Sequence, residues 1–338
     1  MENIPTHEVS VVIPSWDGAS HLARTLPTVL QQKNLSYEVI VVENGVLNDD
    51  TVSLVNTFQQ NHANLHLVRI AKNTGYAGGV NAGIATAKNK LVAVLCNDNI
   101  ADPYWLYELL LSYGNGTDKK SGCKIAAVMS QSKVAGINTE LRGNLNFCGR
   151  NISYPDPNWL KESVPIFYPG GNAFLFDKTI TALPFDPLYF TYQEDVALGW
   201  RLRNLGYQVL YTHRSIVNSF DGGTTKKMPY WTSFYSERNR LLNLLSFPQR
   251  KTILKYFSFW FFDFLLSILL GSNRGSKIQA ALWIISHFPQ VLQQRNKNQA
   301  ERRVGDEIAL SYLSKKYFSE TKNSLLKKKC NSILERIL

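Results

Sequence analysis

The sequence has few cysteines and comparatively few charged residues. Its four cysteines lie at residues 96, 123, 148 and 330, and their spacing matches no metal-binding pattern. No secretory signal peptide precedes them, so we expect reduced thiols in a cytoplasmic protein. Charged side chains make up 19% of the chain, a little less than is usual for a soluble domain, whereas 44% hydrophobic residues are ample for a core.

Two common phosphate-binding motifs are also missing. No G-x-G-x-x-G directly follows the first apolar run, and the sequence contains no G-x-x-x-x-G-K-[ST]. These absences argue against a dinucleotide-dependent dehydrogenase and against a P-loop kinase.

The net charge of +11 is unevenly distributed along the chain. Residues 1–245 carry 21 Lys and Arg against 20 Asp and Glu, whereas residues 246–338 carry 16 against 6. A nearly neutral first part argues against a nucleic-acid groove there. A basic second part of this kind fits nucleic acid, anionic lipid or no particular partner, and its neighbouring segments decide among them. We therefore expect two units that meet near residue 245.

Apolar runs alternate with helical patterns in the first hundred residues. The apolar runs are Val9–Ile13, Glu38–Val42, Leu65–Ile70 and Leu91–Cys96, and the helical patterns are Ser20–Gln32, Asp50–Asn61 and Gly79–Lys88. This order predicts βαβ units. The expected fold class is therefore α/β, with a mostly parallel sheet flanked by helices.

Polar residues follow each of these four apolar runs. They are Pro14-Ser15-Trp16-Asp17, Glu43-Asn44-Gly45, the segment from Asn73 to Asn81, and Asn97-Asp98-Asn99. Each segment alone has the composition of a turn. The carboxyl ends of parallel strands meet at one edge of a sheet, however, and ligands bind there. An aromatic ring, amide and carboxylate groups and glycines at that edge suit a nucleotide.

Together these segments resemble the inverting family 2 glycosyltransferases of the GT-A fold, and within them the bacterial rhamnosyltransferase-like branch. VSVVIPSWDG resembles the first strand of the family, VIVVENG the second, and NTGYAGGVNAG a stretch of that branch. CNDN stands where the family carries its D-x-D metal motif. YPGGNAFLF, YFTYQEDVALGWRLRNLGYQVLY and SFYSERNRLLNLL follow in the family's order. The resemblance covers residues 8–245 well, which makes residues 1–245 the expected catalytic domain and 246–338 a basic helical extension.

The resemblance implies transfer of a sugar with inversion, L-rhamnose from dTDP-β-L-rhamnose, to a lipid-linked or growing cell-surface glycan such as O-antigen, capsule or cell-wall polysaccharide. It makes Asp195 the catalytic base and Glu194 its neighbour, although carboxylates in a first helical turn also occur simply as partners of the helix dipole. Asp98, with His213, would hold Mg²⁺ or Mn²⁺, and a single carboxylate suffices where a diphosphate supplies further oxygens.

The resemblance also implies a set of residues for the nucleotide sugar: Pro14, Trp16, Glu43, Asn44, Asn73, Gly78, Gly79, Asn81, Asn97, Asp98, Gly171, Arg238 and Arg240. Trp16 would stack on the base, and Glu43 and Asn44 would read its edge. Arg238 and Arg240 are two positions apart in a helical pattern, so they cannot share one face. We expect Arg238 to reach the site. Lys226 and Lys227 could close over the donor or form a solvated charge pair.

Residues 252–270, TILKYFSFWFFDFLLSILL, are nearly long enough to span a membrane. Thr252, Lys255, Asp263 and Ser267 form a narrow polar stripe along this helical pattern, which fits a helix lying in the membrane surface better than one crossing it. A second apolar segment is Ala280–Leu292. These features predict peripheral attachment to an anionic inner membrane face. A helical subdomain packed on the core, or an oligomer interface, would give the same pattern.

Other functions fit the sequence less well. The same fold could use a UDP-hexose or a UDP-N-acetylhexosamine. A nucleotide-sugar nucleotidyltransferase would need a glycine-rich, basic first loop, where this chain has Pro14-Ser15-Trp16-Asp17. A non-catalytic basic protein that binds membrane or RNA would leave Asp98 and Asp195 without a role. We therefore expect no nucleic-acid partner, and an oligomer remains compatible with the sequence.

Overall fold

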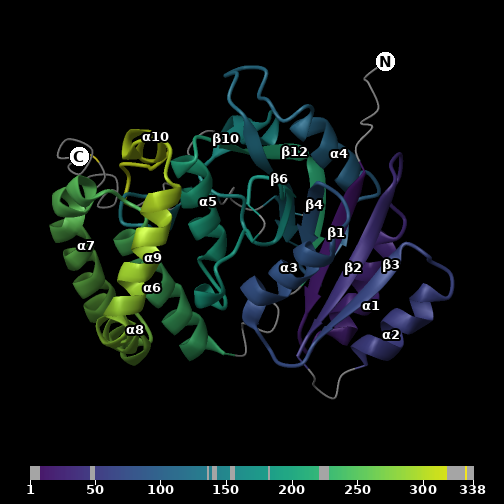
Figure 1. Cartoon of the computed structure of the whole chain (residues 1–338), viewed down its shortest axis with the longest axis horizontal. Coiled ribbons are helices and arrows are strands. Elements are labelled where there is room, and N and C mark those ends of the chain that lie inside the picture. The colour runs from purple at the N-terminus through teal and green to yellow at the C-terminus, as the bar shows by residue number, and fades with distance from the viewer. Residues whose placement is uncertain are drawn as a thin grey trace.

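The computed structural model describes residues 8–45, 50–134, 137–138, 143–152, 157–181, 183–220, 228–317 and 332. A mixed, mostly parallel sheet forms the centre, and helices cover both of its faces (Figure 1). Its main path runs in the order β10-β12-β6-β11-β4-β1-β2-β3, while β5 pairs with β12 and β7 with β6. The predicted α/β class with a mostly parallel sheet is confirmed.

The first four strands and their helices follow the predicted alternation. They are β1 (Val9–Ser15), α1 (Ala19–Val29), β2 (Tyr37–Asn44), α2 (Thr51–Gln59), β3 (Leu65–Ile70), α3 (Gly75–Thr86) and β4 (Leu91–Leu95). Strand β1 is parallel to both β2 and β4, and β2 is parallel to β3. All four carboxyl ends therefore lie at one edge of the sheet.

The second half of the sheet brings distant segments to the same edge. It contains β5 (Asn99–Ala101), α4 (Trp105–Tyr113), β6 (Ile125–Val134), β7 (Ile137–Asn138), β10 (Val164–Ile166), β11 (Ala173–Asp177), α5 (Glu194–Asn204) and β12 (Gln208–Ser219). Strand β11 is antiparallel to β4, with Ala173 opposite Leu95. The start of β11 therefore meets the end of β4. Strands β8 (Asn144–Leu145) and β9 (Asn151–Ile152) pair in a separate two-stranded sheet, and the 3₁₀ turns are η1 (Pro157–Leu160) and η2 (Pro187–Tyr189).

Two apolar layers hold the helices on the sheet. Helices α1, α2 and α4 pack on one face through residues such as Leu26, Val55 and Leu109. Helices α3 and α5 pack on the other face through residues such as Val80 and Leu198. Strands β1, β2 and β4 are buried on both faces, which explains why they are continuous apolar runs in the sequence.

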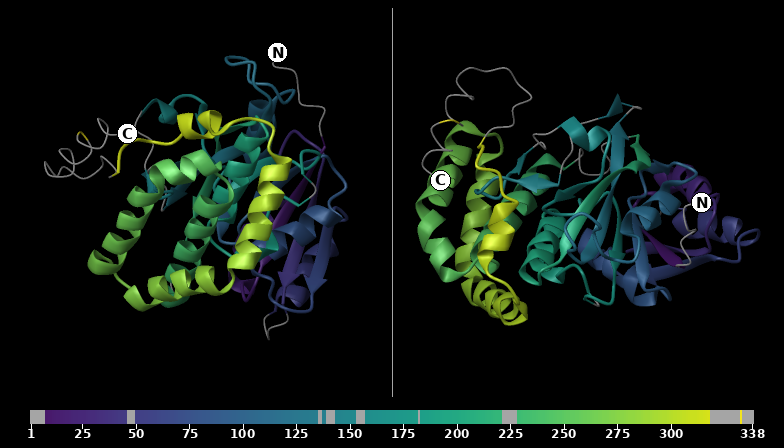
Figure 2. Two further views of the ribbon diagram at one scale, coloured as in Figure 1. Left: turned by 60° about the vertical axis from the view of Figure 1, so that its left-hand side comes forward. Right: turned by 90° about the horizontal axis from the view of Figure 1, so that it is seen from above.

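The C-terminal region is a helical layer beside α5. It consists of α6 (Pro229–Ser246), α7 (Arg250–Leu270), α8 (Arg274–Ser286), α9 (Phe288–Glu301) and α10 (Asp306–Ser311). Figure 2 shows these helices, green to yellow, beside the sheet. Because α6 packs against α8 and α9, this layer begins before the predicted boundary at residue 245.

The structure adds detail to two sequence features of this region. The apolar segment Ala280–Leu292 is not one helix, because the chain changes direction at His287 before Phe288-Pro289. Proline favours the first turn of a new helix and restricts the residue before it. In the polar stripe of α7, Thr252 and Asp263 face the protein and are buried, whereas Lys255 is exposed.

Candidate active site

Asp98 lies at the carboxyl edge of the sheet, in the three-residue connection between the buried strand β4 and β5. Its side chain is half-buried and accepts a hydrogen bond from Asn99 Nδ2 at 3.1 Å. Its backbone oxygen accepts one from Phe220 N at 3.3 Å, directly after the end of β12. The carboxylate therefore sits where three strand ends meet.

Asn99 and Asn172 form a buried amide pair that joins Asp98 to the start of β11. Asn99 Nδ2 donates to Asn172 Oδ1 at 2.6 Å, and Asn172 Nδ2 donates back to Asn99 Oδ1 at 3.2 Å. Cys96 N donates to the Asn172 backbone oxygen at 2.9 Å. Asn99 is fully buried, so its amide is satisfied by protein groups rather than by solvent.

Gly171 joins the same turn to Asp195. Its backbone nitrogen donates to Asp195 Oδ2 at 2.9 Å, while Asp195 Oδ1 accepts from Val196 N at 2.8 Å. The Gly171 oxygen accepts hydrogen bonds from the Tyr76 hydroxyl and from Cys96 Sγ. One turn, Gly171-Asn172, thus contacts the surroundings of Asp98 on one side and Asp195 on the other. Asp98 and Asp195 are 97 positions apart in the sequence, and this turn brings them into one site.

The environments of Glu194 and Asp195 differ. Glu194 is buried, and its Oε2 has no hydrogen-bond partner among the residues that the structure describes. Burial, reinforced by the neighbouring Asp195, raises the pKa of Glu194 well above its ordinary value, which favours a neutral carboxylic acid. Asp195 is half-buried; burial raises its pKa too, but hydrogen bonds from Val196 and Gly171 oppose the shift. Asp195 is therefore the member of the pair that ionises more readily.

The backbone before this pair is strained. Phe190, Tyr192 and Gln193 have φ angles of 60°, 64° and 64°, a left-handed region that non-glycine residues rarely occupy. Such strain persists only where surrounding contacts enforce it, and it is common at functional sites. Here the three residues lead directly into α5, whose first two residues are Glu194 and Asp195.

Asn239, on α6, holds this strained loop. It is fully buried, and its Nδ2 donates to the backbone oxygens of Tyr189, Thr191 and Tyr192 at 2.8, 2.9 and 2.7 Å. Asn239, Tyr76 and Asn99 were not predicted as site residues from the sequence. The sequence offered a signal for each of them. Asn239 lies between the two arginines of SERNR, and Tyr76 and Asn99 lie close to predicted residues.

Several residues predicted to bind the nucleotide instead bind the protein. The Asn44 amide donates to Gly75 O at 2.7 Å and accepts from Thr74 N and Oγ1. Asn81 exchanges two hydrogen bonds with the Phe185 backbone. Their amides are thus used in fixing the loop before α3 and the segment at Phe185. The prediction that Asn44 reads the base edge has no support in this geometry.

The glycines of α3 allow close contact with protein rather than with phosphate. A Cβ on Gly79 would lie 2.9 Å from Asn44 Nδ2 and 3.3 Å from Pro14 Cβ, and one on Gly78 would meet the Thr74 side chain at 2.3 Å. Asn73 Oδ1 accepts from Gly75 N and so forms the turn that starts the helix. These residues therefore fix the backbone next to the edge of the sheet.

The remaining edge residues lie where the sequence places them. Trp16 is half-buried directly after β1. Glu43 is buried at the end of β2, and its Oε2 accepts from Arg69 Nε at 2.6 Å. Asn97 Nδ2 donates to Ser15 Oγ at 3.0 Å and so ties the end of β4 to the end of β1. Trp16 therefore stays the predicted stacking partner of the base.

The sequence predicted that His213 follows the end of a strand, but the structure places it within β12. Strand β12 continues to Ser219, and His213 lies in an irregular stretch between Thr212 and Ile216. Thr212 and Ser219 pair with β6 at Ser130 and Val134, roughly 13 Å apart along that strand, and Ser219 is the end near Asp98. His213 instead hydrogen-bonds to the backbone at Glu162, and burial together with Arg214 lowers its pKa. The structural reason for pairing it with Asp98 is therefore lost.

Neither arginine of SERNR lies in the site, contrary to prediction. Arg238 Nη2 donates to the backbone oxygens of Leu188 and Tyr189, and its guanidinium stacks 4.6 Å from the Trp283 ring. Burial lowers its pKa to about 10. Arg240 forms buried ion pairs with Glu237 and Asp263 and faces neither water nor lipid headgroups. Lys226 and Lys227 lie outside the described residues.

A divalent cation would have only a partial set of protein ligands here. Among the described residues, no group of three or more His, Cys, Asp or Glu side chains could hold a metal ion. Asp98 is a half-buried carboxylate at the strand ends of this edge, next to Asn99. Mg²⁺ and Mn²⁺ bound with a diphosphate need one or two protein carboxylates, so Asp98 fits a cation shared with substrate.

The sequence of residues 10–178 matches the family described as glycosyl transferase family 2, and the chain belongs to this family. The poly-β-1,6-N-acetyl-D-glucosamine synthase of Staphylococcus epidermidis is 24% identical over 240 residues, which is 66% of this chain and 53% of that protein. The chain thus spans about half of that relative's length. It spans 12% to 36% of three other curated relatives.

Two solved structures share the fold. GalNAc-T7 with UDP, GalNAc and Mn²⁺ aligns with a TM-score of 0.59 and 15% identity, over 76% of this chain and 50% of that one. Residues 1–349 of S. aureus TarS in complex with UDP align with a TM-score of 0.51 and 14% identity, over 87% and 88%. At these identities, the likeness shows a GT-A-like fold.

Proposed function

We propose that this protein is an inverting glycosyltransferase that moves a sugar from a nucleoside diphosphate to a hydroxyl group of a glycan. The observation that carries the proposal is the Gly171-Asn172 turn, which joins Asp195 to the surroundings of Asp98. Family membership supports the reaction class.

Asp195 is the proposed base. It takes the proton of the acceptor hydroxyl as that oxygen forms its bond to the anomeric carbon. The bond from this carbon to the diphosphate oxygen breaks, and its electron pair leaves with the diphosphate. Hydrogen bonds from Gly171 and Val196 fix the Asp195 carboxylate, and a pKa raised by burial makes it a stronger base than an exposed aspartate.

Asp98 is the proposed protein ligand of Mg²⁺ or Mn²⁺. When bound, the cation neutralises charge on the leaving diphosphate. Asp98 itself is held in position by Asn99, whose amide is in turn fixed by Asn172. The Mn²⁺ and UDP named for GalNAc-T7 support a divalent metal for this fold.

Two donor classes are proposed. The motif NTGYAGGVNAG resembles the rhamnosyltransferase-like branch and favours L-rhamnose from dTDP-β-L-rhamnose. The names of the S. epidermidis synthase and of the two structures with UDP favour a UDP-N-acetylhexosamine instead. In both cases we propose a lipid-linked glycan of a cell-surface polysaccharide as acceptor and a peripheral location on the cytoplasmic face of the membrane.

Nucleoside diphosphate release from dTDP-rhamnose, UDP-N-acetylglucosamine and UDP-N-acetylgalactosamine, with Mg²⁺ or Mn²⁺, tests the proposal. Asp195→Asn should lower kcat by about 10²–10⁴-fold and leave donor affinity unchanged, since the base acts only on the acceptor proton. Asp98→Asn should weaken metal-dependent donor binding. Asp118→Asn, on a remote exposed turn, is the matched control. Full turnover by Asp195→Asn would contradict the proposal.

A further inference from the structure

The apolar side of α7 faces outward. Leu254, Phe257, Phe262, Leu269 and Leu270 are 54% to 81% exposed, and Phe261 is 49% exposed. The helix is 21 residues long. Its most apolar stretch has a mean hydropathy of 1.7, and 11% of that stretch is buried inside the protein. A soluble protein rarely exposes a continuous apolar surface of this kind unless something covers it.

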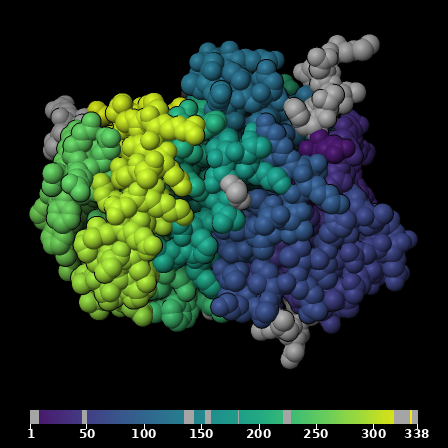
Figure 3. Space-filling view, viewed as in Figure 1, coloured from purple at the N-terminus to yellow at the C-terminus, as the bar shows by residue number. Residues whose placement is uncertain are grey.

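Helix α8 extends this surface. Ile278, Leu282 and Ile285 are 46% to 71% exposed, and their spacing of four and three residues puts them on one helical face. Lys277 Nζ donates to Ser267 O at 2.6 Å, and Arg274 Nη2 donates to Leu269 O at 2.8 Å, so the two helices are tied together. We call these exposed apolar residues the outer face of α7 and α8. In Figure 3, α7 (green) lies at the end of the molecule opposite the N-terminal strands (purple).

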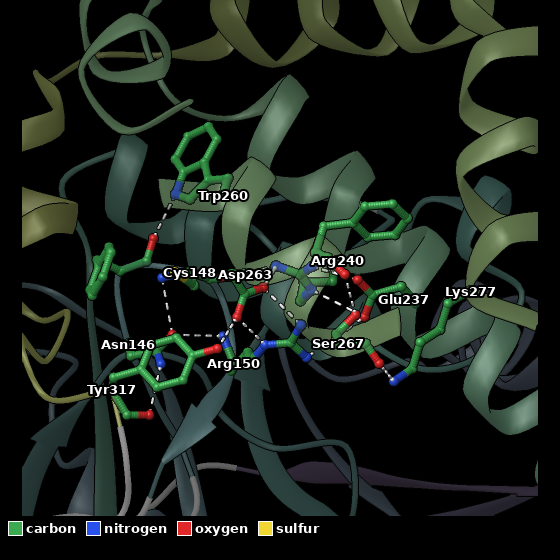
Figure 4. A network of polar contacts seen from close by, with 12 residues as sticks. Asn146, Cys148, Arg150, Glu237, Arg240, Trp260, Asp263, Ser267, Lys277 and Tyr317 are labelled. Carbon is green, nitrogen blue, oxygen red and sulfur yellow. Dashed lines mark hydrogen bonds and ion pairs between the residues drawn. The ribbon is translucent and has the colours of Figure 1, made fainter. Parts of the chain in front are cut away.

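A buried ion cluster fixes which side of α7 faces out (Figure 4). Arg150 binds Asp263 through two bonds of 2.6 and 2.7 Å, and Arg240 Nη1 lies 3.2 Å from Asp263 Oδ2. Arg240 also pairs with Glu237 at 2.5 Å, so two arginines balance two carboxylates. Turning α7 about its axis would leave these charges buried without partners, which costs several kcal/mol.

The charge around the outer face has one sign. From Arg250 to Glu301, α7–α9 and their connections contain seven Lys and Arg but only Asp263 and Glu301 as acids. Asp263 lies in the buried cluster, and Glu301 is paired with Arg201. Arg250, Lys251 and Lys255, toward the start of α7, and Arg274, just beyond its end, are exposed. The apolar face is therefore bordered by cations.

We infer that the outer face of α7 and α8 binds the surface of an anionic lipid bilayer. Apolar side chains enter the boundary between headgroups and acyl chains while the basic residues bind anionic headgroups, as in interfacial amphipathic helices. A second copy fits less well, because two such faces would bring basic residues together without exposed carboxylates to pair with. Crossing the bilayer would place the Arg150–Asp263 cluster in hydrocarbon, so α7 lies on the membrane with its polar side on the protein.

Vesicle flotation of the full chain tests this inference. We expect the protein to float with vesicles of phosphatidylcholine and phosphatidylglycerol, and less with phosphatidylcholine alone. The double variant Phe262→Glu, Leu269→Glu should reduce binding at least about tenfold, since both side chains lie on one face and lose their apolar transfer. Both positions are exposed, so the fold should persist, which circular dichroism and thermal unfolding check. The matched control is Leu160→Glu, Leu183→Glu, two exposed leucines of the sheet domain, which should bind like the parent.

Absence of the parent from the vesicle fraction, or equal flotation of parent and double variant, would overturn the inference. An oligomer that the double variant dissociates, without vesicle binding, would assign the face to a second copy and overturn it as well. This inference deepens the proposed function by naming where the acceptor's lipid lies. Nucleoside diphosphate release, measured without vesicles, tests the two proposals separately. Turnover without flotation refutes only lipid binding by the outer face, and flotation without turnover refutes only the proposed transferase activity.

Discussion

Replacing Asn239 with alanine should damage turnover more than its effect on stability would suggest. The side chain touches no atom of the proposed reaction, yet its Nδ2 donates to three backbone oxygens of the loop at Tyr189–Tyr192. That loop ends at Gln193, the residue before Glu194 and Asp195. Asn239 is thus a positioning residue for the proposed base.

The magnitude follows from the contacts. Losing the amide removes the two N–H donors that bind the half-buried oxygens of Thr191 and Tyr192, at about 1–3 kcal/mol for each lost bond, while the Tyr189 oxygen keeps its bond from Arg238. Three non-glycine residues at positive φ store roughly 1–2 kcal/mol each. With the restraint removed, the strained loop can relax and shift the start of α5. A shift of about 1 Å at a reacting group can lower the rate by about 10²-fold.

The assay combines urea unfolding with steady-state turnover. We expect Asn239→Ala to lose about 2–4 kcal/mol in the free energy of unfolding and at least about tenfold in kcat, with KM for the donor nearly unchanged. Asn146→Ala is the control, because Asn146 is also fully buried and binds three backbone groups, those of Cys148, Arg150 and Tyr317. It should lose similar stability and keep kcat. Equal kcat in both variants would refute the positioning role.

Two further predictions concern the buried carboxyl groups. Glu194→Gln should raise stability at pH 7, because the raised pKa of Glu194 means that its ionisation opposes folding. A neutral Glu194 places no charge beside Asp195, so the acid limb of the pH–rate profile should not move, and a limb shifted to lower pH would show that Glu194 is ionised in the folded protein. Asp263→Asn should cost about 3 kcal/mol at pH 7. Burial raises the pKa of Asp263, but Arg150 and Arg240 outweigh this effect and lower the pKa. The contribution of ionised Asp263 to the free energy of unfolding is therefore complete above about pH 5 and is lost as the pH falls through the lowered pKa. The difference in the free energy of unfolding between Asp263→Asn and the parent, measured in urea, should therefore become smaller toward pH 3. Glu162→Gln, in the exposed pair with Lys120, should have little effect on this free energy at any pH.

The part of the site that could be predicted depends on parallel strands. Short apolar runs that end in polar residues, such as Val92–Leu95, indicate strands buried on both faces, and parallel strands bring their polar ends to one edge. Asp98 and Trp16 could therefore be placed from the sequence alone. Asn44 and Asn81 could not, because an amide that binds a backbone and an amide that binds a ligand have the same sequence pattern. His213 was misplaced because an irregular stretch inside β12 interrupts the apolar run without ending the strand.

The motif SERNR shows why the remaining site residues could not be assigned from the sequence. Residues 237–240 are consecutive on α6, and successive side chains leave a helix about 100° apart. Arg238 and Asn239 therefore reach the loop before Asp195, whereas Glu237 and Arg240 reach the cluster that holds α7. The partners of Arg238 and Asn239 lie roughly 50 residues upstream. Those of Glu237 and Arg240 lie roughly 90 residues upstream and some 25 residues downstream, so no local pattern reveals them. The motif is important because α6 supports both the proposed base and the outer face of α7 and α8, and its two arginines do so by binding protein groups.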